Sequence, residues 1–115
     1  MTDLEQVEIQ IEVANTMRKL RDNAIKLMDN KLFKDVIGEG YFKEEAARLV
    51  MAKSASLAPE HEKLIDNMIY GVGALNNYLD AIVERGRQMD AAIGEHEETR
   101  DEILAEEMAQ AEGSA

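Results

Sequence analysis

The sequence predicts an all-α fold: a long antiparallel helical hairpin with a short intervening helix, coiled-coil-like packing and self-association into an oligomer. One observation is a run of apolar residues at spacings of three and four, the pattern of a helix whose narrow stripe needs cover from other helices. Its members are Ile65, Met68, Val72, Leu75, Leu79, Ile82, Met89 and Ile93, and Gly86 occupies the position between Ile82 and Met89. The other is composition: 45% of the 115 residues are hydrophobic, but only 4% are aromatic, which favours a thin aliphatic core.

The first predicted helix covers about residues 3–30. Thr2 can cap its free amides while Glu5 reaches back, as in a capping box. The apolar positions then follow helical spacing: Leu4, Val7, Ile11, Ala14, Met17, Leu20, Ala24 and Leu27. Three successive spacings of three rotate this stripe, and a second row of Ile9, Val13, Met17 and Leu20 widens it. We therefore expect this helix to pack on more than one neighbour.

The middle segment predicts a turn followed by a short helix over about residues 41–53. Gly38 and Gly40 offer a left-handed cap and a sharp redirection of the chain. Tyr41 and Phe42 then flank the entry to the short helix. We interpret them as a structural elbow, with an apolar patch for a partner as the alternative.

The second long helix is predicted for about residues 59–93. Pro59 suits a first helical turn, where a missing amide hydrogen costs nothing. At 1.5 Å per residue the helix is roughly 50 Å long, so it must pair with the first helix, self-associate along its stripe, or do both. Gly71, Gly73 and Gly86 remove side-chain bulk and indicate close approach of another helix. The predicted interface is the stripe from Ile65 to Ile93 together with Tyr41 and Phe42.

Residues 1–93 thus form one predicted helical domain, and residues 94–115 form an acidic, partly helical or frayed tail. The tail has eight acidic residues against Arg100 alone, a local charge of −7 out of a total of −11. Basic residues gather instead between Arg18 and Lys34, with a local excess of +4. Each charged segment is either a solvated helix surface or a docking site, and the basic one could pair with an acidic tail.

Several functions are disfavoured by composition. A net charge of −11 opposes direct binding to nucleic acid or to an anionic membrane, and no apolar run approaches the roughly 20 residues of a membrane span. The two histidines, His61 and His96, lie in Glu-His-Glu triplets, but Ala58 and Ile93 stand where a Glu-x-x-His metal motif needs glutamate. Ser54, Ser56 and Ser114 lack the context of a catalytic nucleophile. We expect no cofactor, no metal and no enzymatic activity.

A resemblance adds one expectation. The stretch from Phe33 through Gly38-Glu39-Gly40-Tyr41-Phe42-Lys43-Glu44-Glu45-Ala46 to Val50, followed by Tyr70-Gly71-Val72-Gly73-Ala74-Leu75 and an acidic end, resembles small helical proteins encoded by tailed bacteriophages. It covers about Leu32 to Glu102 and leaves out the first helix. Such genes often lie near head and portal genes, so the resemblance implies a role in the virion or its assembly.

The sequence therefore leads to two functional hypotheses. The first is a non-enzymatic phage interaction or assembly protein, located in the host cytoplasm or the virion. It would form a homo-oligomer and contact a phage structural or host protein. The alternative is an acidic inhibitor that imitates nucleic acid and blocks a host nuclease or polymerase, because carboxylates dominate the surface charge.

Overall fold

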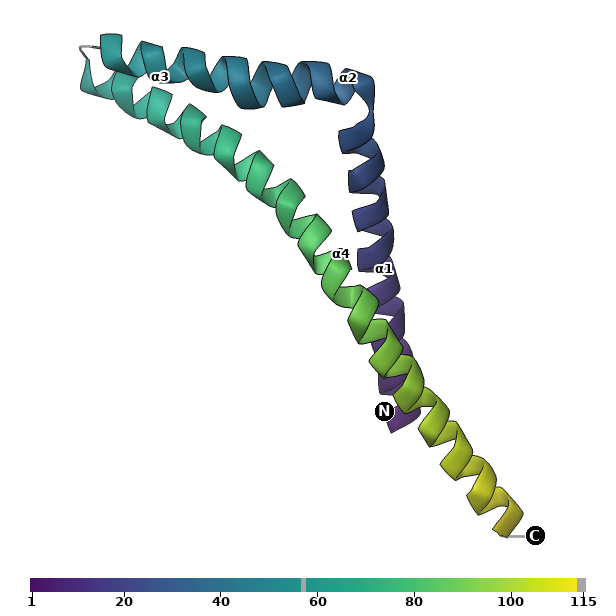
Figure 1. Ribbon diagram of the computed structural model, residues 1–115. Coiled ribbons are helices and arrows are strands. Elements are labelled where there is room, and N and C mark those ends of the chain that lie inside the picture. Colours follow the sequence, from purple (N-terminus) through teal and green to yellow (C-terminus); the bar gives the residue numbers. More distant parts are fainter. Residues whose placement is uncertain (57, 114–115) are drawn as a thin grey trace. The chain divides into compact units, whose positions relative to one another are not determined.

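The computed structural model describes residues 1–56 and 58–113, and this part of the chain is helical without strands, which confirms the predicted all-α class (Figure 1). Its elements in order are α1 (Asp3–Asp29), α2 (Lys31–Phe33), η1 (Lys34–Glu45), α3 (Ala46–Ala55) and α4 (Pro59–Gly113). The contacts divide the chain into two compact units. We call Asn23–Ala81 the hairpin unit, and Met1–Asp22 with the described residues from 82 onward the terminal unit.

Helix α1 begins where the sequence predicts. The Glu5 amide donates a hydrogen bond of 3.1 Å to the Thr2 hydroxyl oxygen, which satisfies one of the amides that a helix start leaves unpaired. Acidic side chains occupy the first turn and Lys26 the last, in the order that the helix dipole favours.

The break after α1 lies at Asn30, and the predicted turn at Gly38 and Gly40 is wrong. Asn30 is extended, with φ −69° and ψ 132°, and its side-chain oxygen accepts from the Leu32 amide at 2.9 Å and the Phe33 amide at 3.3 Å. This side-chain cap starts a new helix without any glycine. Neither Gly38 nor Gly40 has positive φ, and both lie inside η1, which is wound as a π-helix. The short helix expected over 41–53 is therefore the last part of an unbroken helical run from residue 31 to 55.

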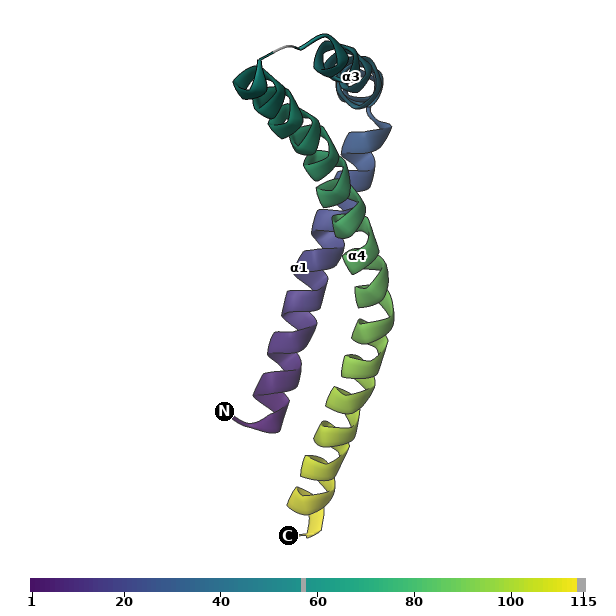
Figure 2. The ribbon, with the colours of Figure 1, turned by 90° about the vertical axis from the view of Figure 1, so that its left-hand side faces the viewer.

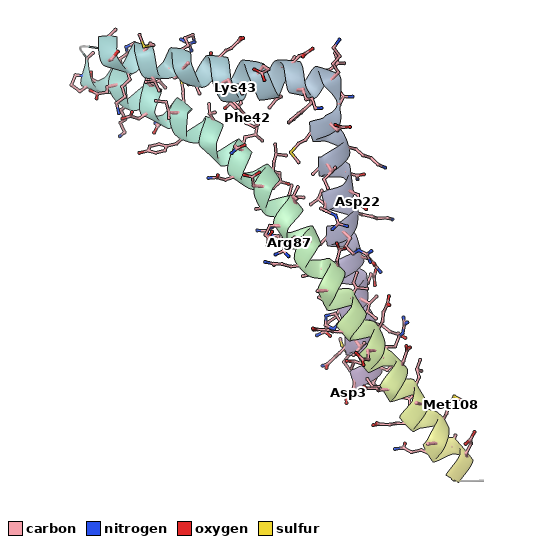
Figure 3. The ribbon with its side chains drawn as sticks, in the orientation of Figure 1. Asp3, Asp22, Phe42, Lys43, Arg87 and Met108 are labelled. Carbon is pink, nitrogen blue, oxygen red and sulfur yellow. The ribbon has the colours of Figure 1, made fainter. Side chains whose placement is uncertain are left out.

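The hairpin unit is held by a small apolar core between the η1–α3 run and the first part of α4. Leu49 is 2% exposed and packs with the buried Ile65 and Val72. Tyr41 and Phe42 are partly buried against this cluster, and Figure 3 shows Phe42 on the side of η1 that faces α4. Together these side chains close a helical hairpin whose second helix begins at Pro59, as expected.

An ion pair joins the two sides of this hairpin. Lys53 Nζ lies 2.7 Å from Asp66 Oδ1. The hydrogen bond to Asp66 raises the pKa of Lys53. The pair therefore links α3 to α4 at the surface, close to the apolar core.

In the terminal unit, α1 and the second half of α4 lie side by side and antiparallel (Figures 1 and 2). The direction follows from two neighbours: Arg21 lies beside Gly86, whereas Glu8 and Arg100 line one hollow. Buried side chains along the contact are Val7, Ile11, Ala14, Ile82 and Ile93.

Helix α4 does not end near residue 93 but continues to Gly113. The spacings of three and four continue past Ile93 through His96, Arg100 and Ile103, which are half-buried in the terminal unit. Partial cover of these positions supports the helix against carboxylate repulsion. Residues 104 to 113 are all exposed. Figure 3 shows why: Met108 lies on the part of α4 that extends beyond Asp3, at the start of α1. Ser114 and Ala115, the end of the predicted tail, lie outside the described residues.

Candidate interaction surfaces

The predicted interface residues divide between the two units. In the hairpin unit Ile65, Val72 and Leu79 are buried, Leu75 is half-buried, and Met68 remains 44% exposed. The stripe is thus largely covered within one chain. Tyr41 and Phe42 stack against each other at a tilt, with ring centroids 5.9 Å apart, beside the core of this same unit. Both lie inside the unbroken helical run, so they are side chains of the core and do not form the elbow that the sequence predicted.

The terminal unit contains the remaining three predicted interface residues. Ile82 and Ile93 are buried and Met89 is half-buried. Since Val7, Ile11 and Ala14 of α1 are buried in the same unit, this end of the stripe is also covered by the chain itself. Little of the stripe besides Met68 therefore remains open to a partner.

Gly86 lies at a close contact between α1 and α4 in the terminal unit. A Cβ added there would lie against Arg21 Cβ and Cγ and 2.9 Å from Cδ, closer than real Cβ contacts allow. The obstacle is the root of the Arg21 side chain, which cannot swing away without moving α1. The predicted close packing is confirmed at Gly86. It is wrong at Gly73, where an added Cβ would meet nothing within 4 Å, and Gly71 has only an ordinary contact of 3.7 Å with the Tyr41 hydroxyl.

Two arginines of α1 bracket one carboxylate of α4. Arg21 Nη1 lies 2.7 Å from Asp90 Oδ2, and Arg18 Nε lies 2.9 Å from Asp90 Oδ1. The Arg21 side chain is only 14% exposed, because its stem lies over Gly86. The hydrogen bond from Arg21 is the main cause that lowers the pKa of Asp90, and the same bond raises the pKa of Arg21.

The apolar pattern of the sequence does not indicate these arginines, because they are charged. The stripe predicted for α1 continued through Met17 and Leu20, yet Leu20 is 48% exposed. The covered positions instead keep a strict seven-residue pattern: Leu4, Val7, Ile11, Ala14, Arg18 and Arg21. Continuing the spacings of three and four through Ala14 would have placed both arginines at the contact with α4, and the acidic Asp90 one turn after Gly86 supplies their partner.

The second row of α1 lies open on the surface of the terminal unit. Ile9, Val13 and Leu20 are 45%, 49% and 48% exposed, and Thr16 between them is exposed as well. We call these four residues the outer row. Met17, which the sequence placed in the same row, is half-buried and lines an apolar notch of about 170 Å³ with Leu20, Ile82 and Arg85.

A polar hollow of about 500 Å³ runs along the other side of the outer row. Its lining is Glu8, Ile11, Glu12, Asn15, Thr16, Lys19 and Arg100. Glu12 and Lys19 both make no ion pair within the part of the chain that the structure describes. The outer row is therefore bordered by two opposite charges that are open to a partner.

The side chains that could act in catalysis or bind a metal do not come together in the described ranges. His61 lies 3.4 Å from the Ser56 hydroxyl in the hairpin unit, whereas His96 is half-buried in the terminal unit. The Ser54 hydroxyl donates to the Met51 carbonyl at 2.8 Å. Within residues 1–56 and 58–113 no group of three metal-ligating side chains is found. The predicted basic segment is also partly engaged, since Arg18 and Arg21 hold Asp90, and Lys34 lies 3.1 Å from Asp29.

Comparisons with protein-family models, with curated proteins and with solved structures find no match to this chain. None of the described helices is sufficiently long and apolar to cross a membrane. The function is therefore inferred from the exposed surfaces of the helices and from the sequence.

Proposed function

We propose that this chain is a non-enzymatic interaction protein that works by presenting helix surfaces to other helices. The observation that carries the proposal is the outer row of α1. Its apolar residues are each 45 to 49% exposed although the opposite face of the same helix is buried on α4. An exposed apolar face on a helix whose opposite face is already packed is a common docking surface for another helix.

The setting we propose is assembly of a tailed bacteriophage, in the host cytoplasm or in the virion. Its support is the resemblance of the segment around Gly40, Tyr41 and Phe42 to small helical phage proteins. Self-association and contact with a phage structural or host protein belong to this proposal. In this proposal the chain catalyses no reaction and binds no cofactor.

The test is the mass of the purified full chain in solution. Sedimentation equilibrium and light scattering over about 10 μM to 1 mM protein should give a mass above the 12.9 kDa of one chain. A chain that stays at 12.9 kDa throughout this range would contradict self-association. In infected cells, chemical cross-linking followed by mass spectrometry should place the chain next to capsid or portal subunits. Cross-links to metabolic enzymes alone would contradict the assembly role.

A second candidate function is that of an acidic inhibitor that imitates nucleic acid, and the exposed end of α4 supports it. Beyond Ile103 the described end of α4 is a fully exposed helix that carries Glu106, Glu107 and Glu112 and no basic residue. A cluster of exposed carboxylates can imitate the charge of a phosphate backbone. The discriminating experiment captures host proteins on the full chain and tests whether a captured nuclease or polymerase loses DNA binding in a salt-sensitive way.

A further inference from the structure

We propose that the outer row of α1 is a homodimer interface, at which a second copy of this chain packs its own outer row in antiparallel orientation. The inference rests on the proposed function and specifies its first partner. Ile9, Val13, Thr16 and Leu20 follow one another at spacings of four, three and four. That spacing keeps all four side chains on one stripe of a straight helix, as packing between two helices requires.

An antiparallel arrangement lets this stripe match itself. With a two-fold axis between positions 14 and 15, Ile9 faces Leu20 of the second copy and Leu20 faces its Ile9. Val13 likewise faces Thr16. Such an interface is isologous, since the same patch serves both subunits. Thr16 fits a covered position because its hydroxyl already donates to the Glu12 carbonyl at 3.1 Å, so burial leaves no donor unpaired.

The charges beside the stripe select both the occupant and its direction. Glu12 and Lys19 border the outer row on one side, seven residues apart, and both are exposed without an ion pair in the described ranges. In the antiparallel dimer Glu12 of each copy meets Lys19 of the other, which gives two attractive pairs. In a parallel dimer, this flank of one copy would meet the other flank of its partner, so Glu12 and Lys19 would form no pair across the contact. The sequence extends this pattern with Glu5 seven residues before Glu12 and Lys26 seven after Lys19.

The expected complex is weak and reversible. The outer row covers about 17 Å of helix at 1.5 Å per residue, and it contributes three apolar side chains per chain. Interfaces of this size belong to the class below about 1,200 Å², which is typical of transient association. The measurement must therefore reach high protein concentration.

Charge-reversal variants of the full chain test this dimer, and sedimentation equilibrium measures its affinity. Glu12→Lys places like charges opposite each other in both pairs, and so does Lys19→Glu. Each single variant should weaken the dimer by about tenfold, since two exposed pairs change from attraction to repulsion. An equimolar mixture of the two variants should recover the affinity, because both pairs are then attractive. The double variant Glu12→Lys/Lys19→Glu should also recover it.

Matched controls separate this effect from net charge and from unfolding. Glu98→Lys and Lys63→Glu change the charge equally at exposed positions of α4 and should leave the dimer unchanged. Val13→Gln should abolish the dimer, whereas Met108→Gln, on the exposed end of α4, should not. Circular dichroism should show equal helix content for all variants.

The outcomes distinguish this inference from the broader function. An oligomer that is insensitive to every α1 variant overturns the α1 interface alone and leaves self-association through another surface. A dimer weakened by both single variants but not recovered in their mixture overturns the antiparallel pairing. A wild-type chain that is monomeric up to 1 mM overturns both the interface and the proposed self-association.

Discussion

Replacement of Gly86 by alanine tests the close contact between α1 and α4 in the terminal unit. The added methyl group would lie against Arg21 Cβ and Cγ, and the position of Cβ is fixed by the α1 backbone. Forcing extra volume into a packed contact costs about 1 to 3 kcal/mol. Removing a glycine from a helix interior returns about 1 kcal/mol. The expected net effect on the free energy of unfolding is a loss of up to about 2 kcal/mol.

Gly94→Ala is the matched control because it measures the gain from replacing a helical glycine by alanine without any new contact. Gly94 lies on the same helix in the same unit, and a Cβ there would meet nothing within 4 Å. This variant should be more stable than the wild type by about 1 kcal/mol. The difference between the two variants, about 1 to 3 kcal/mol, then isolates the contact with Arg21.

The assay is urea unfolding of the full chain, followed by circular dichroism at the helix band. Transition midpoints should be compared at equal slope, since a changed slope would indicate loss of two-state behaviour. Protein concentration must be held constant, because self-association adds to apparent stability. If Gly86→Ala and Gly94→Ala shift the midpoint equally, the two helices do not touch at Gly86 and the argument fails.

Three further predictions concern single features of each unit. Asp90 has a pKa below its ordinary value, so its contribution to stability is present above the unfolded pKa of about 3.9 and is lost as the pH falls through the lower folded pKa. Wild-type stability should consequently fall more steeply below about pH 4 than that of Asp90→Asn, and parallel acid unfolding curves would contradict the pairing with Arg18 and Arg21. Leu49→Ala should cost about 2 to 5 kcal/mol in urea unfolding, against less than about 0.5 for Met51→Ala, whose side chain is 70% exposed. Truncation after Leu104 should remove helical signal in proportion to the length removed but change the free energy of unfolding in urea by less than about 0.5 kcal/mol, because residues 105–113 are exposed; a larger loss would mean that they pack.

Local sequence signals predicted the helix starts well. Thr2 and Pro59 are residues that suit the first turn for reasons independent of the fold, and both helices begin there. Asn30 carried an equally good signal, since asparagine is among the preferred capping residues. Gly38 and Gly40 offered a second way to turn the chain, and local signals alone do not decide between the two.

The sequence alone does not show whether Gly38 and Gly40 lie in a turn or in a helix. The free-energy cost of a helical glycine can be offset by the apolar surface that neighbouring residues bury. A glycine inside a helix costs about 1 kcal/mol relative to alanine. Tyr41 and Phe42 follow Gly40 directly and pack against the Leu49 cluster, so the helical conformation gains more than the glycines lose. Only the folded hairpin unit brings these residues together. The same limitation applied to Arg21, whose burial requires the space that Gly86 provides on another helix.

The surface that the sequence indicated as an interface and the surface left open are therefore different. The apolar stripe of α4 is the more regular pattern, and the chain covers most of it itself. The α1 pattern is irregular because it combines two stripes: one through Val7, Ile11 and Ala14 that meets α4, and the outer row on the opposite face. A helix with a single partner needs only the first of these. The second row, bordered by charges of opposite sign at a seven-residue spacing, is explained by a second helical neighbour, and the charge-reversal variants test whether that neighbour is another copy of the same chain.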